Sequence, residues 1–371
     1  MTGHGGNIYE FAEASGFSER EIIDFSASIN PLGLPETVKA AINRSMKQLC
    51  NYPDPDAGKL RSEIAQHLCI SPESVICGNG STELIYLVAK ALRPERVLIP
   101  VPTFSEYERA CRISCGSQIT GYKLQQKNNF DILPEEFIET MEKMVKTPIQ
   151  NPKSKIQNPK PGNKAAFLCN PNNPTGRLIR KDDVLKIANA ARELKCYLVV
   201  DEAFIDFVPG DSVCKAVEEN THLIVLRSMT KIYAISGLRI GYGVFPSNSL
   251  SLIKKHKEPW TVNTIAQEAG VAAVNDKGYI KKTFLFIDRE KRFIEKKFKE
   301  LGIDFLPSAA NYYLIRVNNA DELIKSLQGK GIMVRDCSNF GGLGRYYIRV
   351  AVKRRGENIK LLKELSSRCT G

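Results

Sequence analysis

Short apolar segments alternate with amphipathic ones through the middle of this 371-residue chain, and this alternation constrains its fold more than any other feature. Between the apolar segments, residues such as Leu84, Val88 and Leu92 recur at helical spacing. The runs with the length of buried strands are 74–77, 97–99, 165–169, 197–200 and 223–226. Strands and helices in alternation predict an α/β fold with a mostly parallel sheet covered on both faces.

The pattern changes after about residue 245. A basic helical stretch at roughly 277–300 is followed by strand-like segments at 312–316, 332–335 and 346–350. We therefore expect a large domain at 41–245 and a smaller α+β domain at 246–371. Residues 1–40 are expected to pack with the small domain. A duplicated polar stretch with four prolines, at 147–163, predicts a flexible surface insertion.

The composition of the chain bears on which kinds of ligand and partner it can have. The net charge of +12 fits attraction of anionic ligands, or simply a lysine-rich surface. No nucleic-acid motif and no basic run interleaved with aromatic residues is present, so no nucleic-acid partner is expected. No apolar run approaches the ~18–20 residues of a membrane span, and no signal peptide is found, so we expect no membrane association and a cytoplasmic protein. Ten cysteines without a Cys-x-x-Cys pair, and four scattered histidines, indicate reduced thiols and no metal site.

Polar residues follow several of the expected strands directly. They are Asn79, Asn170, Asp201 and Ser228. Ligands of parallel sheets bind at the carboxyl ends of the strands. The sequence therefore predicts one site at which these residues converge.

Lys231 gives that site its chemistry. It closes Ser228-Met229-Thr230-Lys231, after Asp201-Glu202-Ala203-Phe204 and before Arg239. A lysine that forms a Schiff base and an aspartate that charges a ring nitrogen are the reactive parts of a pyridoxal 5′-phosphate site. Taken alone, Lys231 would be a surface charge and Asp201 a helix cap, but Ser228 and Arg239 would then need separate explanations.

Other residues suit the remaining parts of such a cofactor. Gly80, Ser81 and Thr82 begin a helix whose N–H groups can meet the phosphate, with Ser228 and Arg239 adding polar contacts. Phe104 is either a core residue or stacks on the ring. Arg335 and Arg349 lie on neighbouring strand-like segments, where they can hold two anions such as a carboxylate and a phosphate.

With these residues the chain resembles the fold type I pyridoxal phosphate enzymes, in the histidinol-phosphate aminotransferase-like branch. Within it the chain is most similar to the threonine-phosphate decarboxylases of cobalamin biosynthesis. The similarity spans almost the whole chain except 147–163. Its marks are the segments 4–7, 24–33, 201–207 and 345–349, which read HGGN, DFSASINPLG, DEAFIDF and RYYIR.

The resemblance implies a role for each site residue. Lys231 would carry the cofactor, and Asn173 would face the ring hydroxyl and also contact the substrate. Such enzymes are homodimers, and Tyr52 would reach the phosphate of the partner subunit's cofactor. Arg349 would bind the substrate carboxylate. The substrate phosphate would meet Arg335, His4 and Gly5, although His4 is otherwise a frayed terminus.

Two positions bear on the reaction. Aminotransferases of this branch usually carry Tyr where Phe204 stands, and Phe204 cannot donate a hydrogen bond to the ring hydroxyl. This favours a lyase that decarboxylates L-threonine O-3-phosphate to (R)-1-amino-2-propanol O-2-phosphate. Ser28 replaces an Asn that contacts substrate in the decarboxylases, so serine phosphate is an alternative substrate. The alternative functions are histidinol-phosphate aminotransferase or a related transaminase, and a non-catalytic pyridoxal phosphate-binding regulator.

Overall fold

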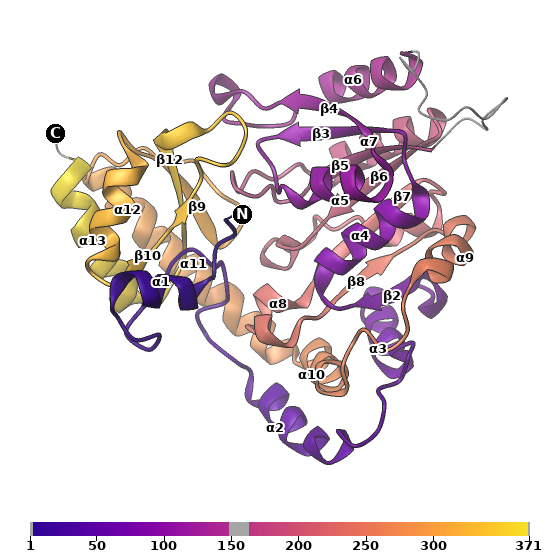
Figure 1. The fold of residues 1–371 in the computed structure, drawn as a ribbon, viewed down its shortest axis with the longest axis horizontal. Helices are drawn as coiled ribbons and strands as arrows, with labels where there is room; N and C mark the ends of the chain where they lie inside the picture. The colour runs from indigo at the N-terminus through magenta and orange to yellow at the C-terminus, as the bar shows by residue number, and fades with distance from the viewer. Residues whose placement is uncertain (1–2, 148–162, 370–371) are drawn as a thin grey trace.

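The computed structural model describes residues 3–147 and 163–369 (Figure 1). The predicted insertion at 147–163 thus lies outside the described residues, apart from its two ends. The strands are β1 (Ile23–Asp24), β2 (Val75–Gly78), β3 (Arg96–Val101), β4 (Gln118–Lys123), β5 (Lys164–Cys169), β6 (Cys196–Asp201), β7 (Leu223–Ser228), β8 (Gly241–Val244), β9 (Tyr312–Arg316), β10 (Ile332–Met333), β11 (Arg335–Asp336) and β12 (Tyr347–Ala351).

The helices fill the segments between these strands. They are α1 (Ile8–Ser15), α2 (Glu36–Ser45), α3 (Gly58–Leu68), α4 (Gly80–Leu92), α5 (Glu106–Cys115), α6 (Pro134–Lys146), α7 (Lys181–Glu193), α8 (Met229–Ile232), α9 (Ser247–His256), α10 (Thr264–Asn275), α11 (Lys277–Glu300), α12 (Ala320–Gln328) and α13 (Arg355–Cys369). Among them, no helix is long and apolar enough to cross a membrane.

A seven-stranded sheet forms the centre of the larger part, in the order β2-β8-β7-β6-β5-β3-β4. Strands β7, β6, β5, β3 and β4 pair in parallel, whereas β8 runs antiparallel to both β2 and β7. The fold class predicted from the sequence is confirmed. The register sets Asp201 beside Cys169 and Leu226, so the ends of β5, β6 and β7 meet at one edge.

Both faces of this sheet are buried. Val199 and Val200, adjacent in β6, are both 0% exposed and belong to different apolar clusters. One cluster includes Leu84 of α4 and Tyr107 of α5, and the other includes Ile187 of α7. Strands buried on two faces read as continuous apolar runs, which explains why they are visible in the sequence.

A smaller antiparallel sheet, in the order β11-β12-β9, packs with α11, α12 and α13 (Figure 1). Its strands confirm the segments expected near 312–316 and 346–350. The segment expected at 332–335 divides in two, because β10 pairs with β1 while β11 pairs with β12. Strand β1 thus joins the N-terminal segment to the C-terminal part of the chain. The domain boundaries themselves stay a prediction.

Candidate active site

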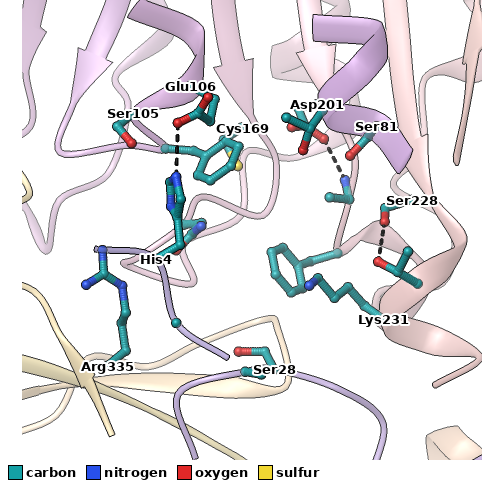
Figure 2. A pocket seen from close by; sticks show the side chains of 18 of the residues that line it. His4, Ser28, Ser81, Ser105, Glu106, Cys169, Asp201, Ser228, Lys231 and Arg335 are labelled. Carbon is teal, nitrogen blue, oxygen red and sulfur yellow. Dashed lines mark hydrogen bonds and ion pairs between the residues drawn. The ribbon is translucent and has the colours of Figure 1, made fainter. Parts of the chain in front are cut away.

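A cavity of about 420 Å³ opens at the carboxyl edge of the parallel strands (Figure 2). This volume lies within the usual range for small-molecule sites, ~300–1,000 Å³. Its walls come from the ends of β5, β6 and β7, the start of α4, strands β11 and β12, and the N-terminal segment. Segments from both sheets therefore build one pocket.

Lys231 enters this cavity from α8, directly after β7. Burial lowers the pKa of Lys231 to about 8, and the positive charges of Arg349 and Arg239 act in the same direction. Since only a neutral amine attacks a carbonyl, this lowering makes Lys231 a far better nucleophile near neutral pH than an ordinary lysine.

Asp201 is the last residue of β6 and is 2% exposed. Its Oδ2 accepts a 2.8 Å hydrogen bond from the Tyr107 hydroxyl, and its Oδ1 accepts a 3.0 Å bond from the Ala203 N–H. Burial raises the pKa of Asp201 to about 6, while both hydrogen bonds oppose this rise. In the described part of the chain Asp201 forms no ion pair, so a cationic ring N–H in the cavity would complete its surroundings.

The start of α4 and the segment around Arg239 form one end of the cavity. Ser81 and Thr82 lie in the first turn of α4, where backbone N–H groups have no partner within the helix. Ser228 Oγ lies 2.7 Å from Thr230 Oγ1 at the same end. Hydroxyl groups, a helix N-terminus and the guanidinium of Arg239 together make an anion site suited to a phosphate.

Aromatic side chains form other walls. Phe104 lies with its ring centroid 5.6 Å from that of His4 and 5.7 Å from that of Tyr107. Phe204 is 5% exposed and meets Tyr312 edge to face at 5.0 Å. Both phenylalanines line the cavity. Neither offers a hydrogen-bond donor to a ligand.

Two buried arginines lie on the side formed by the small sheet. Arg335 and Arg349 are 8% and 6% exposed, and they occupy paired positions of β11 and β12. Arg349 donates to Asn173 Oδ1, and it also donates to the Ser26 carbonyl at 2.7 Å. Ser28 Oγ is buried beside them without a hydrogen-bond partner in the described residues. This side therefore offers two cations and a free hydroxyl.

Most of the residues predicted from the sequence come together. The lining includes His4, Gly5, Ser28, Ser81, Thr82, Phe104, Asn173, Asp201, Phe204, Ser228, Lys231, Arg239, Arg335 and Arg349. Gly80 is not among them but adjoins Arg239, because a Cβ built on it would lie 2.5 Å from the Arg239 Nη2. Tyr52 lies away from this cavity, with 83% exposure and its ring 5.3 Å from that of Trp260.

Two of the four polar residues expected to converge do not reach the cavity, so that expectation was half wrong. The Asn170 side chain is hydrogen-bonded to the backbone of Ile179: its Nδ2 donates to the carbonyl and its Oδ1 accepts from the N–H. Asn79 precedes α4 and donates its N–H to Glu83. Several lining residues were not predicted, among them Glu106, Tyr107 and Cys169. Tyr107 lies three residues after Phe104, in the first turn of α5.

The family follows from a comparison over the whole chain. Residues 20–365 match the model of the family Aminotransferase class I and II. This chain belongs to that family. A threonine-phosphate decarboxylase from Salmonella typhimurium is 36% identical, over 99% of this chain and 97% of its own length.

Relatives with a second activity are nearly as similar. A histidinol-phosphate aminotransferase from Thermoanaerobacter is 32% identical, over 89% of this chain and 90% of its own length. Among solved structures, L-threonine-O-3-phosphate decarboxylase from Porphyromonas gingivalis superposes with a TM-score of 0.78 at 26% identity, covering 92% of this chain and 98% of that one. The family therefore includes relatives with both names.

The cavity fits pyridoxal 5′-phosphate, the cofactor that the sequence predicts. Lys231 supplies the amine, and the buried carboxylate of Asp201 supplies the partner for a ring N–H. The anion site at α4 suits the phosphate. No group of histidine, cysteine and acidic residues arranged to hold a metal ion occurs in residues 3–147 and 163–369.

Proposed function

We propose that this protein is a pyridoxal phosphate-dependent decarboxylase of L-threonine O-3-phosphate, which releases CO2 and (R)-1-amino-2-propanol O-2-phosphate. One observation carries the proposal: Arg335 and Arg349, on paired positions of two strands, both point to one cavity. Two buried guanidinium groups suit a small substrate that carries two anions. L-Threonine O-3-phosphate has a carboxylate and a phosphate.

Different residues of the chain would bind the cofactor and the substrate. Lys231, Asp201, Ser228 and Arg239 would hold the cofactor, which when bound withdraws electrons from the bond that breaks at the substrate α-carbon. Arg349 would hold the substrate carboxylate, and Arg335 would hold the phosphate. Gripping both ends fixes the rotation about the α-carbon and thereby selects which bond breaks. Lys231 or a water molecule would supply the proton that replaces CO2 on the α-carbon.

Phe204 supports decarboxylation over amino transfer. It lies in the cavity at 5% exposure, where a tyrosine would donate a hydrogen bond to the cofactor. Transamination by a histidinol-phosphate aminotransferase is nevertheless the second candidate, because the same cofactor residues serve it and a relative of that name is 32% identical. Ser28 bears on the choice between threonine phosphate and serine phosphate, since its buried hydroxyl is free to meet a substrate.

We also propose a homodimer in the cytoplasm. Tyr52 would then meet the phosphate of the partner subunit's cofactor. Its 83% exposure, together with exposed Met46 and Leu49 nearby in the chain and exposed Trp260 against its ring, supports a second copy covering this surface. Sedimentation velocity measures the assembly, and a monomer at micromolar concentration would contradict it. The nine cysteines with described surroundings are free thiols, which supports a reducing compartment.

One assay tests the reaction. The purified protein with cofactor is given O-phospho-L-threonine, O-phospho-L-serine, or histidinol phosphate with 2-oxoglutarate. Release of CO2 from the first, without a keto acid, is the expected result. Amino transfer to 2-oxoglutarate without CO2 release would instead establish the transaminase. Histidinol phosphate has no carboxylate, so it serves as the control for transamination.

A further inference from the structure

The N-terminal segment lies across the substrate side of the cavity. We call residues 3–6 the strap. Its Gly6 N–H donates a 2.7 Å hydrogen bond to Ser26 Oγ, and its Gly3 carbonyl accepts a 3.2 Å bond from the Asn339 side chain. His4 and Gly5 line the cavity between these two contacts. The strap is therefore fastened at both ends.

The strap shares hydrogen-bond partners with both cavity arginines, Arg335 and Arg349. Asn339 Oδ1 accepts a 2.9 Å hydrogen bond from Arg335, and the Ser26 carbonyl accepts a 2.7 Å bond from Arg349. The two residues that fasten the strap thus also hold the two guanidinium groups.

Glu106 faces the strap from the start of α5. It is 3% exposed and lines the cavity, and its Oε1 lies 3.0 Å from His4 Nε2 (Figure 2). Its Oε2 accepts a 2.6 Å hydrogen bond from the Tyr86 hydroxyl and lies 3.3 Å from Arg109. A buried carboxylate beside the proposed phosphate site would repel the ligand unless a cation lay between them. The reaction as proposed above gives Glu106 no role.

The partners of Glu106 decide where His4 carries its proton. Burial alone would raise the pKa of Glu106, but the hydrogen bonds from Tyr86 and His4 outweigh it and lower the pKa, so the group is ionised. An ionised carboxylate only accepts hydrogen bonds, hence His4 Nε2 must be the donor. Nδ1 of His4 has no hydrogen-bond partner within residues 3–147 and 163–369, so it is the ring nitrogen left for a ligand. To bind an anion, Nδ1 must carry a proton as well.

We infer that Glu106 is a positioning residue for the substrate phosphate: it holds His4 through Nε2, so that His4 takes up a proton on Nδ1 when the phosphate binds and becomes the cation between two anions. The inference rests on the proposed function in that the ligand carries a phosphate. The charged groups around His4 are Glu106 and Arg109 on one side and Arg335 on the other, with Lys231, Arg239 and Arg349 lining the same cavity.

Proton uptake is the property that distinguishes this role from mere packing. The proposed role requires His4 to gain a proton as the phosphate binds, so binding at pH 8 should draw a proton from the buffer. The probe is O-phosphoethanolamine, which has the amine and the phosphate but no carboxylate to lose. It is titrated into the protein with its cofactor by calorimetry, in buffers of different ionisation enthalpy. The heat difference between buffers gives the number of protons taken up.

Three variants make the test specific. Glu106→Gln keeps the shape but removes the charge, and we expect it to lose most of the proton uptake and to bind the probe roughly tenfold more weakly. Tyr86→Phe removes one support of Glu106 and should weaken binding less. Glu108→Gln is the matched control, because Glu108 lies in the same helix and pairs with Arg112 outside the cavity. It should behave as the unaltered protein does.

The outcomes separate this inference from the proposed reaction. If Glu106→Gln takes up as many protons and binds as tightly as the unaltered protein, the positioning role is overturned, whether or not O-phospho-L-threonine releases CO2. If no CO2 is released but probe binding still takes up a proton, and this uptake requires Glu106, the positioning role stands and the proposed decarboxylase function is rejected.

Discussion

The hydroxyl of Tyr107 donates a 2.8 Å hydrogen bond to Oδ2 of Asp201. Both side chains are buried, and the Tyr107 ring stacks on Phe167 with centroids 5.2 Å apart. The ring therefore has little freedom to move the hydroxyl away. This bond lowers the pKa of Asp201 against the burial that raises it to about 6. Tyr107 thus helps to keep the carboxylate ionised and oriented.

Replacing Tyr107 with Phe should raise the pKa of Asp201 further and weaken its hold on the cofactor ring. The loss of one hydrogen bond to a charged group costs about 1.5–3 kcal/mol, so cofactor affinity should fall at least tenfold. Fluorescence titration measures this affinity, and the absorption spectrum recorded against pH shows the protonation of the cofactor ring. Tyr197→Phe, at a half-buried tyrosine of β6 outside the cavity, is the control. Equal affinities in the two variants would contradict the role of Tyr107.

The depressed pKa of Lys231 predicts how pH controls cofactor uptake. Below about pH 8 the amine is mostly protonated and cannot attack, so the uptake rate should rise with pH and level off above about pH 8. Arg349→Met removes a positive charge that lowers this pKa, so the midpoint should move to higher pH. Stopped-flow absorption measures the rate. Lys231→Ala should lose the visible absorption of the covalently held cofactor, and an unchanged spectrum would refute the role of Lys231.

A larger residue in place of Gly80 should disturb the proposed phosphate site. Its φ is +78°, and a Cβ would lie 2.5 Å from Arg239 Nη2, so Gly80→Ala must displace the guanidinium from the proposed phosphate site. We expect cofactor affinity to fall about tenfold or more. Gly210 also has a positive φ, +91°, but faces open space. Gly210→Ala should therefore cost only the ~1 kcal/mol of backbone strain and leave cofactor binding intact. Equal cofactor affinities in the two variants would contradict the proposed effect of position 80 on Arg239.

Exchanging either cavity arginine for lysine should impair substrate binding, because lysine lacks the planar fork that holds an anion by two hydrogen bonds. For Arg349→Lys we expect kcat/KM to fall roughly a hundredfold, since two of its donors also hold Asn173 and Ser26. Steady-state kinetics with O-phospho-L-threonine gives these values. Arg316→Lys, at an exposed position of β9, is the control. Wild-type kinetics in both cavity variants would remove the main support for a substrate with two anions.

The sequence predicts the parallel core well because burial on two faces leaves continuous apolar runs, as in β6 and β7. It does not predict β8, since two of the four residues Gly241–Val244 are glycines with low strand propensity. It also misses β4, an edge strand whose Gln118, Gly121 and Lys123 give no apolar pattern. Both strands form because their neighbours offer hydrogen bonds, which a local pattern cannot report.

The residues of the candidate site also fall into those that the sequence predicts and those that it does not. Residues within motifs, such as Lys231, Asp201 and Asn173, are visible because each motif lies directly after a strand. Glu106 and Tyr107 are not, because their partners His4, Tyr86 and Asp201 lie 20 to 102 residues away in the chain. These groups come together only because the first turn of α5 lies next to Asp201 at the end of β6 and next to the strap. Tyr52 stays a prediction, since its proposed partner belongs to another subunit.

The close packing of α4 against β8 bears on how such a pocket can acquire new substrates. A Cβ on Gly241 would lie 2.6 Å from the Ser81 nitrogen, and one on Gly80 would meet Arg239, so the cofactor half is closed to side-chain variation there. The other half includes side chains from the strap, β11 and β12, and only Gly5 of the strap is closed in the same way, since a Cβ there would lie 2.6 Å from the Ser26 carbonyl oxygen. Substitutions on that half can change what is bound while the reactive apparatus stays in place. Relatives named as decarboxylases and as aminotransferases would then differ mainly on the substrate half, with position 204 as a difference on the cofactor half.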